Sequence, residues 1–369
     1  MRIAFDHQAF TRQRYGGVTR YYFHLINCLS YNNRNQVGVF APFHINEYIK
    51  TLPTSLLQGK FINRYPFKLK PLFRYFNTYT ARPLIARWKP DVIHETYFSP
   101  VRTGPIDVPS VVTVYDMTHE LYPGEFYSWD RTSVHKKKAV DRAKHIICIS
   151  ESTRNDLVEI FNIPKEKIDV IYLAYEDRSL VDSNQTRYRF NTTDRPFILF
   201  VGHRNGYKNF SRFLIAVSTS TEISKQFDVI CFGGSPFTHN EEKLIKKLGL
   251  IDSIKYVGGG DDVLNELYKS ASALIYPSLY EGFGLPLLEA MFHNCPVICS
   301  NTSSLPEVAD DAAEYFDPVD ENSIVGALKN VLLSQDRHNE LVHKGKDRLQ
   351  FFSWEKCAKQ TLQIYEKIS

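Results

Sequence analysis

Two glutamates eight positions apart mark the part of this sequence with the clearest chemical potential. Glu281 and Glu289 enclose Gly282 and Gly284, and Pro286 stands where proline is common in the first turn of a helix. Glycines before a helix let the backbone approach a ligand closely, and the free N–H groups of the first turn favour an anion such as a nucleotide phosphate. The two carboxylates can accept hydrogen bonds from vicinal hydroxyls of a sugar. Taken alone, the pair also fits a solvated loop glutamate and a glutamate that caps a helix.

A cationic loop is the second candidate. Residues 200–209 read Phe-Val-Gly-His-Arg-Asn-Gly-Tyr-Lys-Asn, with Arg204 and Lys208 four positions apart after Gly202. A fixed Arg/Lys pair could compensate the charge of a bound diphosphate, and it would stabilise a transition state in which such a charge develops. Two solvated surface charges are the alternative interpretation.

The front half of the chain offers weaker candidates. Asp116 follows the β-rich run Val111–Tyr115, where a carboxylate could orient an acceptor hydroxyl or accept its proton. His119 could approach the acceptor, but a single histidine in a loop is more often a surface residue or a hydrogen-bonding partner. Gly16 and Gly17 precede a helical pattern and could let the backbone approach a phosphate or a sugar, although paired glycines also mark ordinary turns.

The cysteines indicate neither a metal site nor a disulfide framework. The chain has six, and Cys295 and Cys299 are not accompanied by a second Cys or His pair at ligand spacing. Met1–Phe5 runs directly into polar residues, and no apolar stretch approaches the ~18 residues of a membrane-spanning helix. We therefore expect reduced thiols, a site without metal and a cytoplasmic protein.

Length and composition favour two folded domains. With 369 residues, 43% hydrophobic and 23% charged, the chain can bury two sizeable cores, which excludes intrinsic disorder as its main state. The 45 Lys and Arg against 41 Asp and Glu give a net charge of +4, too balanced for a protein that binds nucleic acid by phosphate neutralisation alone. We therefore expect no nucleic-acid partner.

The elements that must position these residues alternate along the chain. Short β-rich runs lie between longer helical patterns, which is typical of parallel strands with crossover helices. The expected strands are Arg2–Phe5, Gln36–Phe40, Asp91–His94, Ser110–Val114, Ile146–Ile149, Ile168–Ile171, Phe197–Val201, Asp228–Phe232, Ile254–Val257, Ala273–Tyr276, Pro296–Ser300 and Glu314–Phe316, with helices such as Asn240–Leu248 and Leu285–Phe292. Residues 179–195 are polar and without pattern. The sequence thus predicts two tandem α/β domains of the doubly wound, Rossmann-like type, which bind ligands at the carboxyl ends of their strands.

A basic, aromatic segment lies in the first of these domains. Residues 60–89 hold eight Lys and Arg, no acidic residue and eight aromatic side chains, while residues 1–180 as a whole carry 25 basic and 17 acidic residues. Such a composition suits contact with an anionic membrane face or a lipid-linked acceptor. A solvated pair of helices is the alternative.

The segment Tyr276–Met291 resembles the glutamate, seven residues, glutamate motif of the retaining glycosyltransferases of family 4, which have the GT-B fold. Met1–Phe5 with Gly16-Gly17, Val112–Met117 and Ser300–Val308 are similar to other conserved elements of that family. The likeness covers almost the entire chain and is closest to bacterial mannosyltransferases of O-antigen and other surface polysaccharides.

This resemblance implies a role for each candidate. Glu289 would bind the nucleotide ribose and Glu281 the donor sugar, with Asp116, Glu281, Lys208 and Arg204 as the catalytic set and His119 near the acceptor. The full donor-binding set would be Gly16, Gly17, Gly202, Arg204, Lys208, Ser278, Glu281, Gly282, Phe283, Gly284, Leu285 and Glu289. Two departures weaken single assignments: Tyr115 stands where relatives often have histidine, and His203 where many have arginine.

The resemblance also implies an architecture and a reaction. Residues 1–180 and 196–353 would form two domains that face a central cleft, joined by a linker at 181–195, and a helix at 354–369 would pack back on the first. The protein would be a cytoplasmic, membrane-peripheral enzyme that needs no metal and moves a hexose, expected to be mannose from GDP-mannose, to a lipid-linked or surface polysaccharide. A nucleotide-sugar 2-epimerase or phosphorylase of the same fold is an alternative, as is a non-catalytic subunit that binds sugar nucleotides or glycans.

Overall fold

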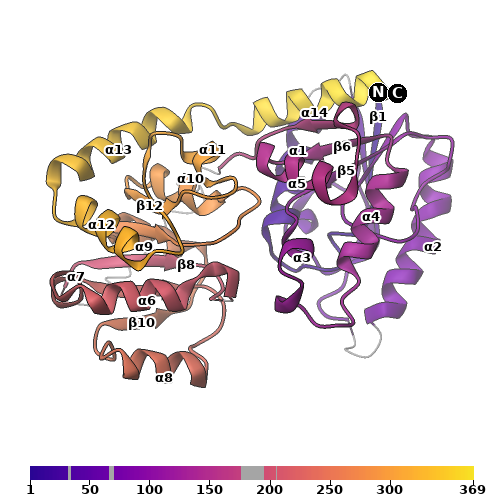
Figure 1. Cartoon of the computed structure of the whole chain (residues 1–369). Coiled ribbons are helices and arrows are strands. Elements are labelled where there is room, and N and C mark those ends of the chain that lie inside the picture. Colours follow the sequence, from indigo (N-terminus) through magenta and orange to yellow (C-terminus); the bar gives the residue numbers. More distant parts are fainter. Residues whose placement is uncertain (32–34, 66–69, 176–194, 205) are drawn as a thin grey trace. The chain divides into compact units, whose positions relative to one another are not determined.

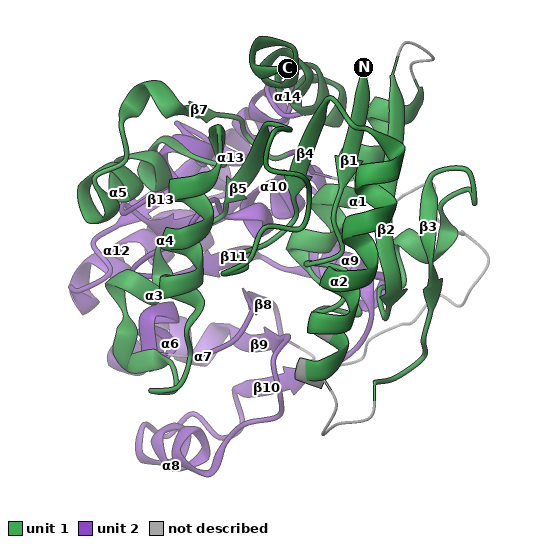
Figure 2. Cartoon of the chain, turned by 90° about the vertical axis from the view of Figure 1, so that its right-hand side faces the viewer, with its two compact units in different colours: residues 1–173, 353–369 green, residues 174–352 purple. Residues whose placement is uncertain are grey.

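The computed structural model describes residues 1–31, 35–65, 70–175, 195–204 and 206–369 (Figure 1). The chain forms two units, one made of Met1–Leu173 with Ser353–Ser369 and the other of Ala174–Phe352 (Figure 2). The predicted linker at 181–195 lies outside the described residues except for its last residue, Arg195. The final helix of the chain belongs to the first unit, which is called unit 1 below; the other is unit 2.

Unit 1 is built on one sheet of seven parallel strands. They are β1 (Arg2–Phe5), β2 (Gln36–His44), β3 (Leu57–Phe61), β4 (Val92–Glu95), β5 (Ser110–Val114), β6 (His145–Cys148) and β7 (Ile168–Val170). Their order is β3-β2-β1-β4-β5-β6-β7, so the chain starts at the centre, moves to one edge and then to the other. Every residue of β4, β5 and β6 is buried, because helices cover both faces of a parallel sheet.

The helices of unit 1 lie mainly between its strands along the chain. They are α1 (Gly17–Tyr31), α2 (Lys70–Trp88), α3 (Thr118–Leu121), α4 (Thr132–Arg142), α5 (Glu151–Phe161) and α14 (Trp354–Ile368), with 3₁₀ turns η1 (Ile49–Thr51), η3 (Pro123–Glu125) and η4 (Lys165–Lys167). The Ser150 hydroxyl accepts the Thr153 amide at the start of α5, and Asn162 ends that helix in the left-handed region at φ 53°. Among the described residues, no helix combines the length and apolar character needed to cross a bilayer.

One strand of unit 1 is absent from the sequence-based prediction. β3 reads Leu-Gln-Gly-Lys-Phe, without the apolar alternation that identifies a half-buried strand, and none of its residues is fully buried. It lies at the edge of the sheet and pairs only with β2. A Cβ at Gly59 would come within 1.9 Å of the Ala41 carbonyl oxygen, so this close pairing depends on glycine.

Unit 2 is built on a second parallel sheet, of six strands. They are β8 (Phe197–Val201), β9 (Asp228–Phe232), β10 (Ile254–Val257), β11 (Ala273–Tyr276), β12 (Val297–Ser300) and β13 (Ala313–Phe316), in the order β10-β9-β8-β11-β12-β13. The helices are α6 (Phe210–Thr219), α7 (Thr221–Gln226), α8 (His239–Lys247), α9 (Asp261–Ser270), α10 (Leu285–Phe292), α11 (Leu305–Ala309), α12 (Glu321–Leu332) and α13 (Gln335–Leu349), with the 3₁₀ turn η6 (Gly206–Lys208). The strand order reverses at β8, and β8 and β11 are neighbours. Ligands of such sheets bind at this point, beyond the carboxyl ends of the strands.

The helix α14 is tied to the sheet of unit 1 by a buried histidine. His94 Nδ1 lies 2.5 Å from the Tyr365 hydroxyl of α14, and His94 Nε2 lies 2.9 Å from the Thr113 hydroxyl of β5. In Figure 1 the yellow α14 runs beside α1 and brings the two chain ends together, where the Ser369 hydroxyl donates to Met1 Sδ at 3.3 Å. Burial lowers the pKa of His94 to about 3.

We expect acid to destabilise unit 1 partly through His94. Histidine in an unfolded chain has a pKa of ~6.5. Between this pH and about 3, His94 therefore binds a proton in the unfolded chain but stays neutral in the folded chain. The stability contributed by neutral His94 is therefore complete above pH 6.5 and is lost as the pH falls toward about 3. From pH 7 to pH 5 the loss is roughly 2 kcal/mol.

Tryptophan fluorescence during urea unfolding measures this effect, because Trp88, Trp129 and Trp354 are the three tryptophans of the chain and all belong to unit 1. The variant His94→Gln should show a smaller difference in free energy of unfolding between the two pH values than the parent protein. An equal difference in both proteins would contradict the prediction.

Candidate active site

The predicted glycine-rich turn lies between β11 and α10, next to the strand-order reversal of unit 2. Gly284 adopts φ 100°, a conformation that favours glycine, and a Cβ there would lie 2.8 Å from Leu305 Cδ2. The helix begins at Leu285 with Pro286 in its first turn, as the sequence predicts. The free N–H groups at the start of α10 therefore lie beside a turn with little side-chain bulk, which suits an anionic ligand.

Glu281 is fixed in this turn through its backbone. Its N–H donates to the Ser303 hydroxyl at 2.9 Å, and its carbonyl oxygen accepts from the Ser304 hydroxyl at 2.9 Å. Ser303 and Ser304 come from the segment after β12, so the neighbouring strand end holds the turn in place. The sequence analysis did not predict these two contacts.

A buried ion pair joins the turn to the cationic loop. Lys208 Nζ donates to Glu281 Oε1 at 2.5 Å, and the Ser278 hydroxyl donates to the same oxygen at 2.5 Å. The two charged side chains are only 14% and 11% exposed. Burial disfavours the ammonium, yet Tyr276 and the Glu281 carboxylate hold the pKa of Lys208 above its ordinary value. Lys208 is therefore a permanent cation at the carboxyl ends of β8 and β11.

Glu289 lies in α10 and contacts a different partner. Its Oε2 accepts a hydrogen bond from the Tyr268 hydroxyl of α9 at 3.2 Å. Burial, followed by the Glu289 charge, raises the pKa of Tyr268, so the phenol stays protonated and donates. The carboxylate thus has a fixed orientation and is only partly buried, which leaves it able to accept a ligand hydroxyl.

Arg204 is buried in contacts of its own within unit 2. Its Nε donates to Glu241 Oε1 at 2.7 Å, and its two terminal nitrogens donate to the carbonyl oxygens of Gly233, Ser235 and Pro236. Its side chain is 4% exposed, and the guanidinium lies 4.9 Å from the centre of the Phe237 ring. These contacts favour a structural role, because binding a diphosphate would require the guanidinium to leave several protein acceptors. The predicted contact with the donor stays a prediction.

We expect Arg204→Gln to destabilise unit 2 rather than to weaken donor binding. Glu241, whose side chain is 16% exposed, also completes the capping box of α8 with Thr238, so loss of the arginine removes its charge partner but not its hydrogen bonds from Thr238, at a cost of about 2 kcal/mol. Circular dichroism, compared with tryptophan fluorescence from unit 1, would show earlier unfolding of the tryptophan-free unit 2. Unchanged stability together with a strongly raised KM for the donor would instead assign Arg204 to the diphosphate.

The remaining donor residues of unit 2 differ in what they expose. Ser278 is 1% exposed and touches Glu281, whereas the Phe283 ring is buried with its centre 6.0 Å from that of Phe352. Only the backbone of Phe283 is thus placed to meet a ligand. Gly202 has φ 124° and donates its N–H to the Phe232 carbonyl oxygen at 2.8 Å, which shapes the bend after β8.

In unit 1, Asp116 follows β5, and its backbone is hydrogen-bonded to a buried lysine, Lys136. Its Oδ1 accepts the Thr118 N–H at 2.9 Å, and its carbonyl oxygen accepts Lys136 Nζ at 2.7 Å. Lys136 also donates to Glu120 Oε2 at 2.7 Å, and both of these side chains are buried. The Asp116 side chain is 38% exposed, so a substrate hydroxyl can reach it.

Lys136 and Glu120 are site residues that the sequence analysis missed. Three consecutive lysines at 136–138 are typical of a solvated helix face, whereas Lys136 is 1% exposed. The helical period contains the signal, because Lys136, Ala139 and Val140 follow the i, i+3, i+4 spacing of the buried side of α4.

His119 and Tyr115 lie close to Asp116 in the sequence but have different surroundings. The His119 ring stacks on Phe126 with 3.8 Å between ring centres, and its Nε2 is 3.7 Å from Asp130 Oδ2. Burial, then the Lys136 charge, lowers the pKa of His119, so it is a neutral imidazole near pH 7. The Tyr115 ring is buried against Tyr21, with 5.9 Å between ring centres. Tyr115 thus belongs to the aromatic core of unit 1.

The predicted Gly16-Gly17 pair forms the start of α1. The Gly16 carbonyl oxygen accepts the Thr19 hydroxyl and the Arg20 N–H, each at 3.0 Å. A Cβ on Gly17 would meet no atom within 4 Å, so the space in front of this helix end is open. The structure therefore leaves room for a ligand at Gly17.

Within each unit, the structure brings some predicted residues together and separates others. In unit 2, Lys208 and Ser278 both donate hydrogen bonds to Glu281, and Glu289 lies on the helix that follows. The Arg204 guanidinium instead contacts Glu241 and nearby backbone carbonyl oxygens. Across the described part of the chain, no group of three or more His, Cys, Asp or Glu side chains is arranged to hold a metal ion. The expectation that no metal is needed stays a prediction.

Comparison with known proteins matches most of the chain to families of glycosyltransferases. Residues 15–177 match the family described as Glycosyltransferase Family 4, and residues 183–348 match the one described as Glycosyl transferases group 1. O-antigen chain mannosyltransferase B of Escherichia coli is 30% identical over 267 residues, covering 70% of this chain and 70% of its own. O-antigen chain mannosyltransferase RfbU of Salmonella typhimurium is 28% identical and covers 72% of both chains.

Solved structures share the fold over the full length. HepE of Anabaena, crystallised with UDP and glucose, superposes with a TM-score of 0.72 at 16% identity and covers 100% of both chains. At this level of identity the likeness concerns architecture: two Rossmann-like units, each with a parallel sheet between helices.

Proposed function

Because the chain belongs to the glycosyltransferases of family 4, enzymes with the GT-B fold, we propose that it transfers mannose from GDP-mannose to a lipid-linked or surface polysaccharide, with retention of configuration. The observation that carries the proposal is the buried Lys208–Glu281 pair beside the glycine-rich start of α10. Two relatives named as O-antigen chain mannosyltransferases support the choice of sugar and acceptor.

The donor would bind in unit 2. We assign its diphosphate to Lys208 and the N–H groups at the start of α10, because a cation and a helix N-terminus both favour this charge. Its ribose hydroxyls would bind Glu289, whose carboxylate is oriented by Tyr268, and its sugar would bind Glu281. Both carboxylates are acceptors, as hydroxyl ligands require.

The chemical step needs stabilisation of a leaving group. The bond between the anomeric carbon and the phosphate oxygen breaks, and the nucleoside diphosphate departs with the electron pair. Lys208 is well suited to this charge, because it is buried, permanently protonated and already positioned by Glu281 before the reaction begins. We propose that it supplies the main protein cation for the leaving diphosphate and that no metal is needed.

The acceptor would be activated by unit 1. We propose that the Asp116 carboxylate takes the proton of the acceptor hydroxyl as its oxygen bonds to the anomeric carbon on the face that the diphosphate leaves, so that the configuration is retained. Lys136 fixes the Asp116 backbone from beneath the site, which makes it a positioning residue for this step. His119 remains a candidate for contact with the acceptor.

An anionic membrane surface is the further partner that we propose, with α2 as the contact. Leu72, Tyr75 and Tyr79 of this helix are 62%, 62% and 67% exposed, and residues 60–89 contain eight cations and no acid. Sedimentation with vesicles would show binding to phosphatidylglycerol that weakens with salt and no binding to phosphatidylcholine alone. Equal binding to both, or to neither, would contradict the membrane contact.

Incubation with a panel of nucleotide sugars, with and without a polyprenyl-linked acceptor, tests the enzymatic proposal. We expect release of nucleoside diphosphate to be fastest with GDP-mannose and to require the acceptor for full rate. A 2-epimerase would convert the nucleotide sugar without transfer, and a binding subunit would release nothing. Either result would overturn the proposed function.

A further inference from the structure

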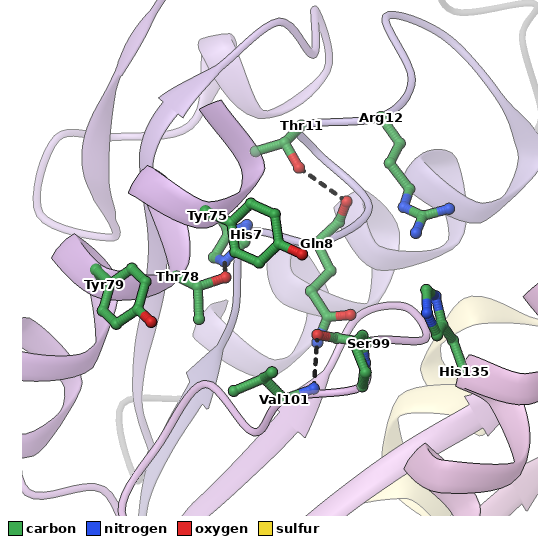
Figure 3. A pocket seen from close by; sticks show the side chains of 11 residues that line it. His7, Gln8, Thr11, Arg12, Tyr75, Thr78, Tyr79, Ser99, Val101 and His135 are labelled. Atoms are coloured by element: carbon green, nitrogen blue, oxygen red, sulfur yellow. Dashed lines mark hydrogen bonds between the residues drawn. The ribbon is translucent and has the colours of Figure 1, made fainter. Parts of the chain in front are cut away.

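A pocket in unit 1 contains none of the residues assigned above to the donor or to the chemical step, although Tyr75 and Tyr79, which line it, lie on the helix α2 proposed as the membrane contact. It lies where β1 and β4 end, and it is closed on one side by α2 (Figure 3). Its volume is about 200 Å³, smaller than pockets for drug-sized ligands and suited to one sugar ring with a small substituent. Its wall comes from the loop after β1, the loop after β4, and the helices α2 and α4.

The floor of this pocket is made of buried polar side chains that are held in place. His7, Gln8 and Thr11 are 3%, 5% and 6% exposed. The Gln8 amide donates to Asp6 Oδ2 at 2.6 Å, and the His7 Nε2 lies 3.1 Å from the Thr78 hydroxyl of α2. Asp6 itself is fully buried and also accepts from Thr96, so it anchors the loop without facing the pocket. Preorganised polar floors of this kind favour a specific polar ligand.

The charged and titratable side chains that line the pocket indicate which class of ligand it favours. Among the residues that the structure describes, no aspartate or glutamate lines the pocket, whereas Arg12, His7 and His135 do. Figure 3 shows Arg12 and His135 on one side, facing Tyr75 and Tyr79 across the pocket. Carboxylates, which accept the hydroxyl hydrogens of a neutral sugar, are available in unit 2 at Glu281 and Glu289 but not at the described wall of this pocket. A wall with a guanidinium and imidazoles instead favours an anion, above all a phosphate.

We propose that this pocket binds a sugar phosphate, with the phosphate at Arg12 and His135 and the sugar ring against Tyr75 and Tyr79. The tyrosines expose large ring faces, 62% and 67% of the residue, on which a sugar can pack while their hydroxyls reach its polar groups. Only the description of this ligand as the acceptor rests on the proposed function. A sugar carried on a lipid phosphate and a free sugar phosphate share this chemistry, and the experiment separates them.

Calorimetry without any donor tests the pocket independently of catalysis. The probes are mannose 1-phosphate, glucose 1-phosphate, methyl mannoside, inorganic phosphate, and a polyprenyl diphosphate sugar in phosphatidylcholine vesicles. The variants are Arg12→Gln and His135→Gln, with Arg87→Gln as a matched control because Arg87 is an exposed cation of the same unit. Lys208→Gln removes the cation of unit 2, so binding there is distinguished from binding in the pocket. Tryptophan fluorescence checks that each variant of unit 1 is folded.

We expect at least one sugar phosphate to bind at least about tenfold more tightly than methyl mannoside. Arg12→Gln should weaken this binding by about tenfold or more, while Arg87→Gln and Lys208→Gln leave it unchanged. Arg12-dependent binding of the free sugar phosphates identifies a soluble source, and Arg12-dependent binding of the vesicle-borne sugar alone identifies a lipid-linked one. Equal affinity for methyl mannoside, or binding that depends on Lys208 and not on Arg12, would overturn the proposal while leaving the assignment of the donor site intact.

Discussion

Replacing Lys208 by methionine is expected to reduce kcat/KM for sugar transfer by about 10²- to 10³-fold, the usual loss when one preorganised charge-stabilising group is removed. Methionine keeps most of the side-chain volume but removes the cation from the Glu281 carboxylate, 2.5 Å away. The same change leaves Glu281 buried without its charge partner. The effect should appear equally in hydrolysis of the donor without acceptor, because both reactions release the nucleoside diphosphate.

A matched substitution separates this effect from a general loss of charge. Lys247 is an exposed lysine at the end of α8 in unit 2, and Lys247→Met should retain parental activity. Lys208→Arg keeps the charge with a different shape and should recover part of the lost rate. Transfer by Lys208→Met within a few-fold of the parent would exclude Lys208 from leaving-group stabilisation.

Replacing Glu289 by alanine is expected to raise the KM for the donor by about 10²-fold, since a carboxylate that accepts two ribose hydroxyls contributes two charge-assisted hydrogen bonds. Tyr268→Phe should have a smaller effect of the same kind, because it removes only the 3.2 Å hydrogen bond that orients the carboxylate. Initial rates over a range of donor concentrations measure both. Glu266→Gln is the control, an exposed glutamate paired with Lys269 on α9.

A donor analogue that lacks the ribose hydroxyls provides a second test of Glu289. A donor analogue without the ribose hydroxyls should bind the parent and Glu289→Ala with similar affinity. If the alanine variant instead discriminates against that analogue as strongly as the parent does, the ribose is bound by other residues.

The sequence predicted the site best where local chemistry determines the structure. The predicted helix Leu285–Phe292 coincides with α10, because Gly284 and Pro286 define its start through backbone conformation. The two sheets follow from short, β-rich strands that are buried along their whole length and mostly apolar, such as Phe197–Val201 and Asp228–Phe232, as is typical of all-parallel sheets. The strand β3 was not predicted because edge strands with polar residues lack this signal.

The partners of charged side chains were the least predictable part. Arg204 and Lys208 belong to one loop, yet Arg204 reaches Glu241 on α8 and Lys208 reaches Glu281 after β11. Glu241 lies 37 positions after Arg204, and Glu281 lies 73 positions after Lys208. These ion pairs therefore depend on tertiary packing, which the spacing of the residues in the sequence does not indicate. Asp116 was predicted from its place after a strand, but the lysine beneath it comes from the helix α4. Spacing thus locates the candidate residues, and tertiary packing assigns their contacts.

Titration calorimetry of a nucleoside diphosphate into the protein tests the central claim most directly. GDP should bind at one site per chain, and Glu289→Ala and Lys208→Met should each weaken its binding by at least about tenfold. Arg87→Gln in unit 1 should bind GDP like the parent. If neither GDP nor UDP binds, or if binding is unaffected by both changes in unit 2, the start of α10 is not the nucleotide site and the account of this enzyme is wrong.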